Sequence, residues 1–325
     1  MPDEGATLEE RLLNGERRAL ARLLTHAENG TERGRAAIQS LYSRTGHAHT
    51  IGVTGSAGAG KSTVVGALAL EYRQRGSTVG IVAVDPSSPF TTGAILGDRV
   101  RMQALTNDPD IFIRSMASRG ALGGLSDGVA DAILLLDAYG KDIILIETVG
   151  AGQDEVEIAG AAQSTILINT PGMGDDIQTM KAGIMEIADV FAVNKADLPG
   201  ADLLIGQLRA LLSLNTAQNW VPPIVRMIAT ERSGIAELAD ACDAHRTFLA
   251  ESGLLAADER KRVRQRILGL TRSRLLAELL DPARGEDRLE TLVTAVVDRT
   301  LDPHAAVDQW LGPPATSDAH SSESS

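Results

Sequence analysis

The stretch that decides the fold is "GSAGAGKST", Gly55 to Thr63, in which three of nine residues are glycine and Lys61 carries the only charge. It matches the pattern G-x-x-x-x-G-K-[ST] and stands between an apolar run predicted as a strand, 51–53, and an amphipathic stretch predicted as a helix, 61–75. A chain that wraps its backbone N–H groups around a polyphosphate needs left-handed backbone angles and close approach, which excludes larger side chains. We therefore predict that the loop binds the phosphates of a nucleotide through nine residues: Gly55, Ser56, Ala57, Gly58, Ala59, Gly60, Lys61, Ser62 and Thr63.

Two side chains of this loop carry the predicted chemistry. The ammonium of Lys61 supplies positive charge to the β and γ phosphates, and the hydroxyl of Ser62 is a candidate ligand of Mg²⁺. The helix that begins at Lys61 points the positive end of its dipole at the same phosphates. A strand, a loop, a lysine and a helix in this order favour a phosphate site over a glycine-rich turn without a ligand.

The rest of the chain has the pattern of an α/β domain with helical additions. From residue 50 onward, short runs that are apolar on both faces alternate with helical stretches, as in parallel strands that are covered on both sides. The sequence therefore predicts a doubly wound, mostly parallel sheet with a P-loop core over residues 49–250. A helical extension is predicted at 1–48, with helices over 8–29 and 33–42, a helical segment at 251–312, and a disordered tail at 313–325.

The segment 251–312 carries an apolar stripe that includes Val263, Ile267 and Leu270. Such a stripe needs a surface to pack on. The segment is therefore predicted either to mediate dimerisation or to fold back on its own domain.

Composition excludes several classes of protein. The 325 residues have a formal net charge of -12 and only 3% aromatic residues, which argues against nucleic acid as a partner. A single cysteine, Cys242, allows no disulfide within the chain and fits a reducing compartment. The N-terminus "MPDEGATLEE" is acidic and unlike a targeting signal, and the apolar run 132–136 is too short to cross a bilayer. We expect a cytoplasmic protein without a membrane segment.

The motif "NKAD", Asn194 to Asp197, indicates which base is bound. It follows the apolar run "VFAV", so it is predicted to lie at the carboxyl edge of the sheet, where the Asp197 carboxylate can accept both hydrogens of the guanine Watson–Crick edge. Asn194 is predicted to tie this loop to the phosphate loop, and the stem of Lys195 to lie on the base. A later strand should bring three further residues beside guanine O6, with the Ala229 N–H as a donor: Ile228, Ala229 and Thr230.

Further residues are candidates for sensing the γ phosphate and holding the metal ion. Glu147 and Gly150 follow a buried strand in "DIILIETVGAGQ", where a carboxylate can hold Mg²⁺ through water and an N–H can meet the phosphate. Asp85 in "VAVDPSSPF" and Asp98 in "GAILGDRVRM" are further candidate ligands, against the alternative of ordinary loop acids. Gln153 is a weaker candidate for orienting the attacking water.

Taken together, "GSAGAGKST", "AVDPSSP", "ILGDRVRM", "ETVGAGQDE" and "GDDIQTMKAGIMEIADVFAVNKAD" make the chain resemble the MeaB/ArgK-type GTPases. These are G-protein chaperones of adenosylcobalamin-dependent acyl-CoA mutases such as methylmalonyl-CoA mutase. The resemblance is dense over about residues 10–250, and the "VDPSSP", "ETVG" and "GDDIQTMKAG" elements are its most specific part.

The resemblance implies a homodimer formed partly through the C-terminal helices, and slow hydrolysis of GTP to GDP with Mg²⁺ that a partner mutase accelerates. The GTPase would gate cobalamin loading and protect or reactivate the mutase, and a cobalamin adenosyltransferase is a second candidate partner. The loop from Gly174 to Lys181 would be an additional switch, with Lys181 stabilising charge near the nucleotide.

The chain departs from the family pattern at three places. Ala57 stands where proline is frequent, which changes the stiffness of the loop more than its contacts. Pro89 and Phe90 replace smaller polar residues, and Ile228 with Ala229 replaces the usual Ser-Ala, which keeps a backbone donor and loses a hydroxyl.

Two other functions fit parts of the pattern. A metal-insertion GTPase of the nickel type would need a cluster of cysteine and histidine, whereas Cys242 and His245 stand alone on a predicted helix. A small-molecule kinase or a transport ATPase would bind adenine, against which "NKAD" argues.

Overall fold

The computed structural model describes residues 6–85, 105, 107–117, 127–148, 160–172, 187–214, 219–279 and 286–311. The described strands form one parallel sheet in the order β3-β2-β4-β1-β5-β6-β7. Their bounds are β1 His49–Gly55, β2 Val79–Asp85, β3 Ile111–Ala117, β4 Ile143–Thr148, β5 Ser164–Asn169, β6 Val190–Val193 and β7 Ile224–Arg226. The predicted doubly wound α/β fold is confirmed.

The helices have the following bounds: α1 Leu8–Leu13, α2 Arg17–Glu28, α3 Glu32–Leu41, α4 Lys61–Gln74, α7 Asp127–Ala138, α11 Ala201–Leu214, α12 Ile235–Glu251, α13 Leu254–Leu279, α14 Glu286–Val297 and α15 Pro303–Leu311. The chain divides into two compact units, Met1–Arg266 and Ile267–Ser325, and α13 spans the division. Within the second unit, Leu292 of α14 and Ala306 of α15 are buried, and Arg288 donates to the Gln309 carbonyl. No described helix is long and apolar enough to cross a membrane.

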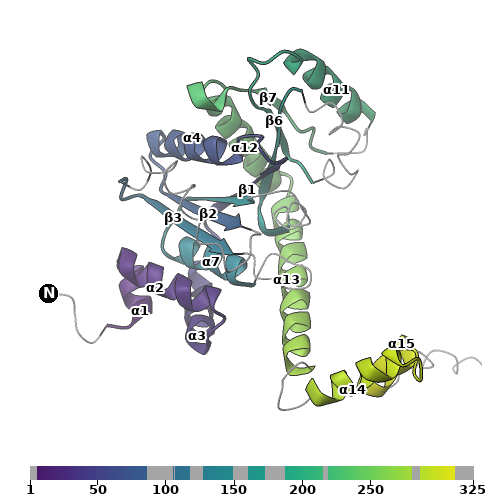
Figure 1. The fold of residues 1–325 in the computed structure, drawn as a ribbon. Helices are drawn as coiled ribbons and strands as arrows, with labels where there is room; N and C mark the ends of the chain where they lie inside the picture. Colours follow the sequence, from purple (N-terminus) through teal and green to yellow (C-terminus); the bar gives the residue numbers. More distant parts are fainter. Residues whose placement is uncertain are drawn as a thin grey trace, which may run out of the picture. The chain divides into compact units, whose positions relative to one another are not determined.

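Both faces of the sheet are covered, which explains why most residues of its strands are apolar on either face. Figure 1 shows α4 and α12 on one side and α7 with the N-terminal helices on the other. Alternate residues of one strand serve the two sides: in β4, Leu145 belongs to the core under α4, and Ile144 and Ile146 belong to the core under α7. At the far end of the sheet, α11 covers β6 through Leu204 and Leu208.

The single helix predicted over 8–29 is wrong, because the chain breaks between α1 and α2. Asn14 ends α1, and Gly15 adopts a left-handed conformation with φ +78°. A capping box begins α1: the Thr7 side chain accepts from the Glu10 N–H, and the Glu10 side chain accepts from the Thr7 N–H. The predicted helix over 33–42 is α3 with slightly different ends.

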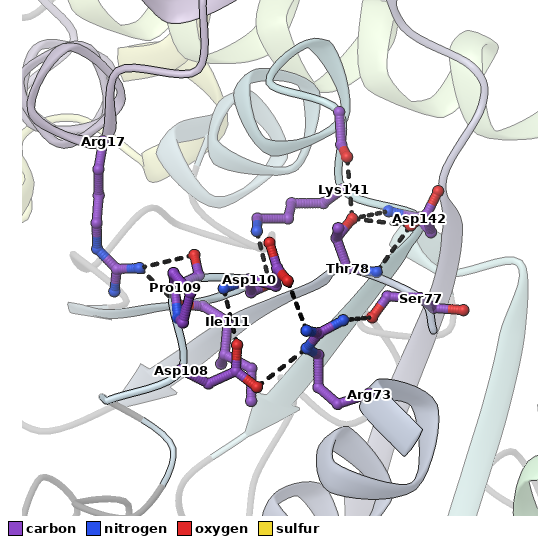
Figure 2. Close-up of polar contacts among 11 residues, drawn as sticks. Arg17, Arg73, Ser77, Thr78, Asp108, Pro109, Asp110, Ile111, Lys141 and Asp142 are labelled. Atoms are coloured by element: carbon purple, nitrogen blue, oxygen red, sulfur yellow. Dashed lines mark hydrogen bonds and ion pairs between the residues drawn. The ribbon is translucent and has the colours of Figure 1, made fainter. Parts of the chain in front are cut away.

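The N-terminal helices are attached to the amino edge of β2 and β3, where several cations meet backbone carbonyls (Figure 2). Arg17 of α2 donates to the Ile111 carbonyl at 2.7 Å, and Lys141 donates to the Asp110 carbonyl at 2.7 Å. Arg73 of α4 forms an ion pair with Asp110 at 2.5 Å. Burial lowers the pKa of Lys141 to about 8. These contacts, with the leucines of α2 in the core, make the extension part of the first unit.

A chain of polar side chains in the same unit joins the first residues of β1 and β5 to α12 and to the residue before β6. The Ser164 hydroxyl lies 2.9 Å from His49 Nε2 and 2.9 Å from His245 Nδ1, and His245 Nε2 lies 3.3 Å from Asp189 Oδ1. Burial lowers the pKa of His49 to about 3 and that of His245 to about 4. Burial also raises the pKa of Asp189 to about 7. This four-residue chain is called the histidine relay below.

Candidate nucleotide-binding site

The phosphate loop joins the end of β1 to the start of α4, as the sequence predicts. A Cβ on Gly55 would lie 2.4 Å from the Ile168 carbonyl oxygen of β5, and one on Gly60 would lie 2.6 Å from the Asn194 Nδ2. Gly60 also has φ +93°, a conformation that other residues rarely adopt. The two glycines of the motif are therefore required by close approach as well as by backbone angle.

Lys61 is held inside this loop. Its side chain is buried, and its Nζ donates to the Gly55 carbonyl at 2.6 Å and to the Ser56 carbonyl at 3.1 Å. A buried ammonium needs such acceptors, because its desolvation is otherwise unfavourable. The contacts hold the positive charge against the first two carbonyls of the loop.

Ser62 of α4 is hydrogen-bonded to Glu147 of β4. The Ser62 hydroxyl donates to Glu147 Oε1 at 2.5 Å, and Glu147 is buried near the end of β4, directly beside Val53 of β1. A hydroxyl and a carboxylate at this position are oxygen donors of the kind that Mg²⁺ prefers. Two of the four residues predicted as metal ligands therefore lie in contact.

The other predicted switch residues are only partly described. Asp85 ends β2, the strand beside β4, and its side chain is outside the described part. Four residues lie outside the described residues altogether: Asp98, Gly150, Gln153 and Lys181.

Asn194 connects the base motif to the phosphate loop. It is buried, its Nδ2 donates to the Ala59 carbonyl at 2.9 Å, and its Oδ1 accepts from the Ala229 N–H at 3.0 Å. The sequence predicts this N–H as a donor to guanine O6, whereas in the structure it donates to Asn194. The amide of one asparagine thus joins the phosphate loop, the "NKAD" loop and the segment after β7.

The remaining base candidates surround this point. Lys195 has φ +56° and its Nζ donates to the Gly58 carbonyl at 2.9 Å, so its side chain spans from the base motif to the phosphate loop. Asp197 is exposed and makes no hydrogen bond to another described residue. Ile228 is half-buried with its N–H bonded to the Ser233 carbonyl, and Thr230 is exposed.

One contact at the base motif has no counterpart among the predicted residues. Arg226, the last residue of β7, donates from Nη2 to the Ala196 carbonyl at 3.0 Å. Its only signal in the sequence is a charge inside the apolar run "PIVRMIA", which does not reveal its partner.

Cys242 and His245 do not form a metal site. Both are buried in α12, and the two ring nitrogens of His245 lie on Ser164 and Asp189 in the histidine relay. Among the described residues, no group of three or more His, Cys, Asp or Glu side chains is placed to hold a metal ion.

Comparison with known proteins decides the family. The model of the methylmalonyl Co-A mutase-associated GTPase MeaB matches residues 20–283. The chain belongs to the MeaB family. The resemblance inferred from the motifs is confirmed, and so is the interpretation of this MeaB-family chain as a P-loop GTPase that binds guanine nucleotide.

Relatives of this MeaB-family chain match over most of its length. A protein of Pyrococcus abyssi that carries a GTPase name is 46% identical over 306 residues, covering 93% of this chain and 94% of that protein. The GTPase ArgK of Escherichia coli is 34% identical over 316 residues, covering 94% and 96%. The mouse protein named methylmalonic aciduria type A homolog, mitochondrial, is 31% identical over 319 residues, covering 92% of this chain and 77% of that protein.

A solved structure agrees with the fold. The crystal structure of a LAO/AO transport system kinase is similar with a TM-score of 0.71 at 28% identity, and the match covers 95% of this chain and 98% of that one.

Proposed function

We propose that this MeaB-family GTPase binds and hydrolyses GTP to gate cobalamin loading into an adenosylcobalamin-dependent acyl-CoA mutase, and that it protects or reactivates that mutase. Methylmalonyl-CoA mutase is the first candidate client. The observation that carries the proposal is the family match over residues 20–283, because the family is described as associated with this mutase.

The described contacts support a guanine-selective site coupled to the phosphates. Asn194 and Lys195 both end on carbonyls of the phosphate loop, at Ala59 and Gly58. Asp197 is exposed beside them and available to accept the two N–H groups of the guanine edge. Adenine would leave this carboxylate without donors, at a cost of about 1–3 kcal/mol.

Mg²⁺ fits the donor set at the start of α4. Ser62 and Glu147 would hold it, with Asp85 and Asp98 as further ligands directly or through water. Mg²⁺ bound with the nucleotide would neutralise part of the negative charge of the phosphates. Lys61 and the backbone N–H groups of the loop then hold the β and γ phosphates. Gly150 would contact the γ phosphate, Gln153 would orient water, and Lys181 would stabilise developing charge.

The proposal includes slow hydrolysis without a partner and a homodimer in the cytoplasm. The apolar stripe of the segment 251–312, which includes Val263, Ile267 and Leu270, is proposed to form part of the dimer interface. A cobalamin adenosyltransferase is proposed as a second partner, because loading of adenosylcobalamin requires a source of the adenosylated cofactor.

The test is GTP turnover by the full chain, measured alone and with purified methylmalonyl-, ethylmalonyl- and hydroxyisobutyryl-type mutases. Acceleration by one mutase identifies the client, and no acceleration by any of them contradicts the chaperone role. In a parallel competition, ATP that displaced labelled GTP at comparable concentration would contradict the switch function.

Base recognition is tested separately with Asp197→Asn. This variant should bind GTP more weakly and favour xanthosine triphosphate, because the amide donates where the xanthine ring carries an oxygen. Unchanged GTP affinity would contradict the assignment of Asp197 while leaving the choice of client open.

A further inference from the structure

Arg226 lies on the strand next to the residue that precedes the base motif "NKAD". It is the last residue of β7 and pairs in register with Val193, the last residue of β6, after which "NKAD" begins. The Nη2 of its guanidinium donates a hydrogen bond to the Ala196 carbonyl at 3.0 Å. The contact is partly buried, and a charged donor makes it stronger than an ordinary neutral hydrogen bond.

The carbonyl that Arg226 holds belongs to the peptide group that joins Ala196 to Asp197. The N–H of the same Ala196 donates to the Met227 carbonyl at 3.1 Å. Both sides of Ala196 are therefore fixed to the segment of β7 and the residue after it. Because a peptide group is planar, fixing its oxygen also fixes the direction in which the chain enters Asp197.

This support is needed because the turn is strained at its start. Lys195 has φ +56°, a left-handed backbone conformation that is unfavourable for a non-glycine residue. The turn is closed by the Leu198 N–H on the Lys195 carbonyl at 3.0 Å. A contact from outside the turn, at the carbonyl that precedes Asp197, therefore bears directly on the direction of the Asp197 side chain.

The second arm of the guanidinium has a smaller role. Nη1 pairs with Asp202 Oδ1 of α11 at 2.5 Å, but the side chains are 53% and 85% exposed. Ion pairs in solvent contribute little. Asp202 is placed to orient the guanidinium, and the bond to the Ala196 carbonyl acts on the base motif.

We infer that Arg226 is a positioning residue for base recognition, which holds Asp197 in the direction needed to accept both the N1–H and the N2–H of guanine. The inference rests on the proposed role of Asp197. Two parallel hydrogen bonds depend more strongly on the angle of the carboxylate than one does. Loosening the loop therefore weakens GTP more than inosine triphosphate, which lacks the 2-amino group.

The experiment measures binding of GTP and inosine triphosphate to the full chain by calorimetry. Arg226→Met removes the donors and keeps an apolar stem, and it should weaken GTP by about 3–10-fold and inosine triphosphate by less than twofold. Arg226→Lys, which retains one cationic donor, should recover part of the GTP preference. Asp202→Asn should change the ratio by less than twofold.

Arg209→Met is the matched control, because Arg209 is an exposed arginine of α11 whose side chain makes no hydrogen bond or ion pair with another described residue. Its ratio of GTP to inosine triphosphate affinity should equal that of the wild type. Melting temperatures of all variants are measured alongside, and every variant should remain folded at the temperature of the binding assay.

The outcomes separate the inference from the function on which it rests. If Arg226→Met weakens both nucleotides equally, or neither, the positioning role is wrong, while a shift of Asp197→Asn toward xanthosine triphosphate still supports the base assignment. If Asp197→Asn shows no such shift, both statements are wrong. A selective loss for GTP in Arg226→Met, together with that shift, supports both.

Discussion

Replacement of Asn194 by alanine is the most informative test of how the site is held together. The side chain makes two hydrogen bonds, to the Ala59 carbonyl at 2.9 Å and from the Ala229 N–H at 3.0 Å, and both partner residues are buried. Each bond contributes about 0.5–1.5 kcal/mol, and each partner left unpaired costs about 1–3 kcal/mol. With two partners left unpaired, we expect Asn194→Ala to lower the free energy of unfolding by about 2–6 kcal/mol.

The chain offers a matched control in Asn169, which is equally buried at the end of the neighbouring strand β5. Its Nδ2 donates to the Leu167 carbonyl at 3.2 Å, and its Oδ1 has no partner among the described residues. Asn169→Ala removes one longer bond and one unsatisfied acceptor, so it should cost about 1 kcal/mol or less.

Urea unfolding followed by circular dichroism gives the two free energies by linear extrapolation. GTP binding by calorimetry is measured alongside, and Asn194→Ala should lose at least about tenfold in affinity, since the loops that it joins are both predicted to contact the nucleotide. If Asn194→Ala costs no more stability than Asn169→Ala, the coupling of the base motif to the phosphate loop does not depend on this amide.

Three further predictions follow from the first unit. Because burial lowers the pKa of His49 to about 3 and of His245 to about 4, the unfolded chain binds more protons below about pH 6.5, so stability is lost as the pH falls from there. The raised pKa of Asp189 has the opposite effect and offsets one histidine, because the folded chain holds this proton and the unfolded chain does not. The free energy of unfolding should therefore fall by about 1.4 kcal/mol for each pH unit between about pH 6.5 and 4. Urea titrations at several pH values measure this slope, and a flat profile would contradict it. Gly60→Ala should cost roughly 1–2 kcal/mol from its backbone angle alone and abolish nucleotide binding, and a variant that binds GTP normally in calorimetry would contradict the tight packing at this position. Arg17→Met should lower the free energy of unfolding by about 1–2 kcal/mol, because it removes hydrogen bonds to the Pro109 and Ile111 carbonyls and a cation–π contact with the Phe112 ring. An unchanged urea midpoint would contradict this.

The sequence predicts those parts of the molecule that depend on local pattern. The helix after the phosphate loop begins at Lys61 in the structure, and "VFAV" is the strand before "NKAD", because a short apolar run followed by a turn has few alternatives in an α/β chain. The pair Asn14-Gly15 is itself a signal that a helix ends, because these residues favour left-handed backbone. The leucine spacing continues across the pair and conceals the break. Periodicity alone does not separate one long helix from two short ones.

Contacts between distant side chains are not predictable in this way. The histidine relay joins His49, Ser164, Asp189 and His245 from separate elements, and no spacing in the sequence relates them. The bond of Arg226 to Ala196 depends on the rotamer of a long side chain at a strand end, and the bond of Ala229 to Asn194 depends on which way an amide faces. Such details follow from packing in three dimensions.

The base motif and the candidate metal ligands make different kinds of side-chain contact, and this difference bears on switching. On the base side, Asn194 and Arg226 end on backbone groups, whereas on the phosphate side the Ser62 hydroxyl meets the Glu147 carboxylate. A switch must keep the base while its contacts to the terminal phosphate change, and a pair of oxygen side chains exchanges partners with a cation more readily than a backbone network does. Glu147→Gln, which keeps the shape and removes the charge, should therefore leave the preference for GTP over ATP unchanged and raise the Mg²⁺ concentration needed for half-maximal turnover. Turnover with the Mg²⁺ dependence of the wild type would remove Glu147 from the metal site, and a changed base preference would show that the two ends are not separable.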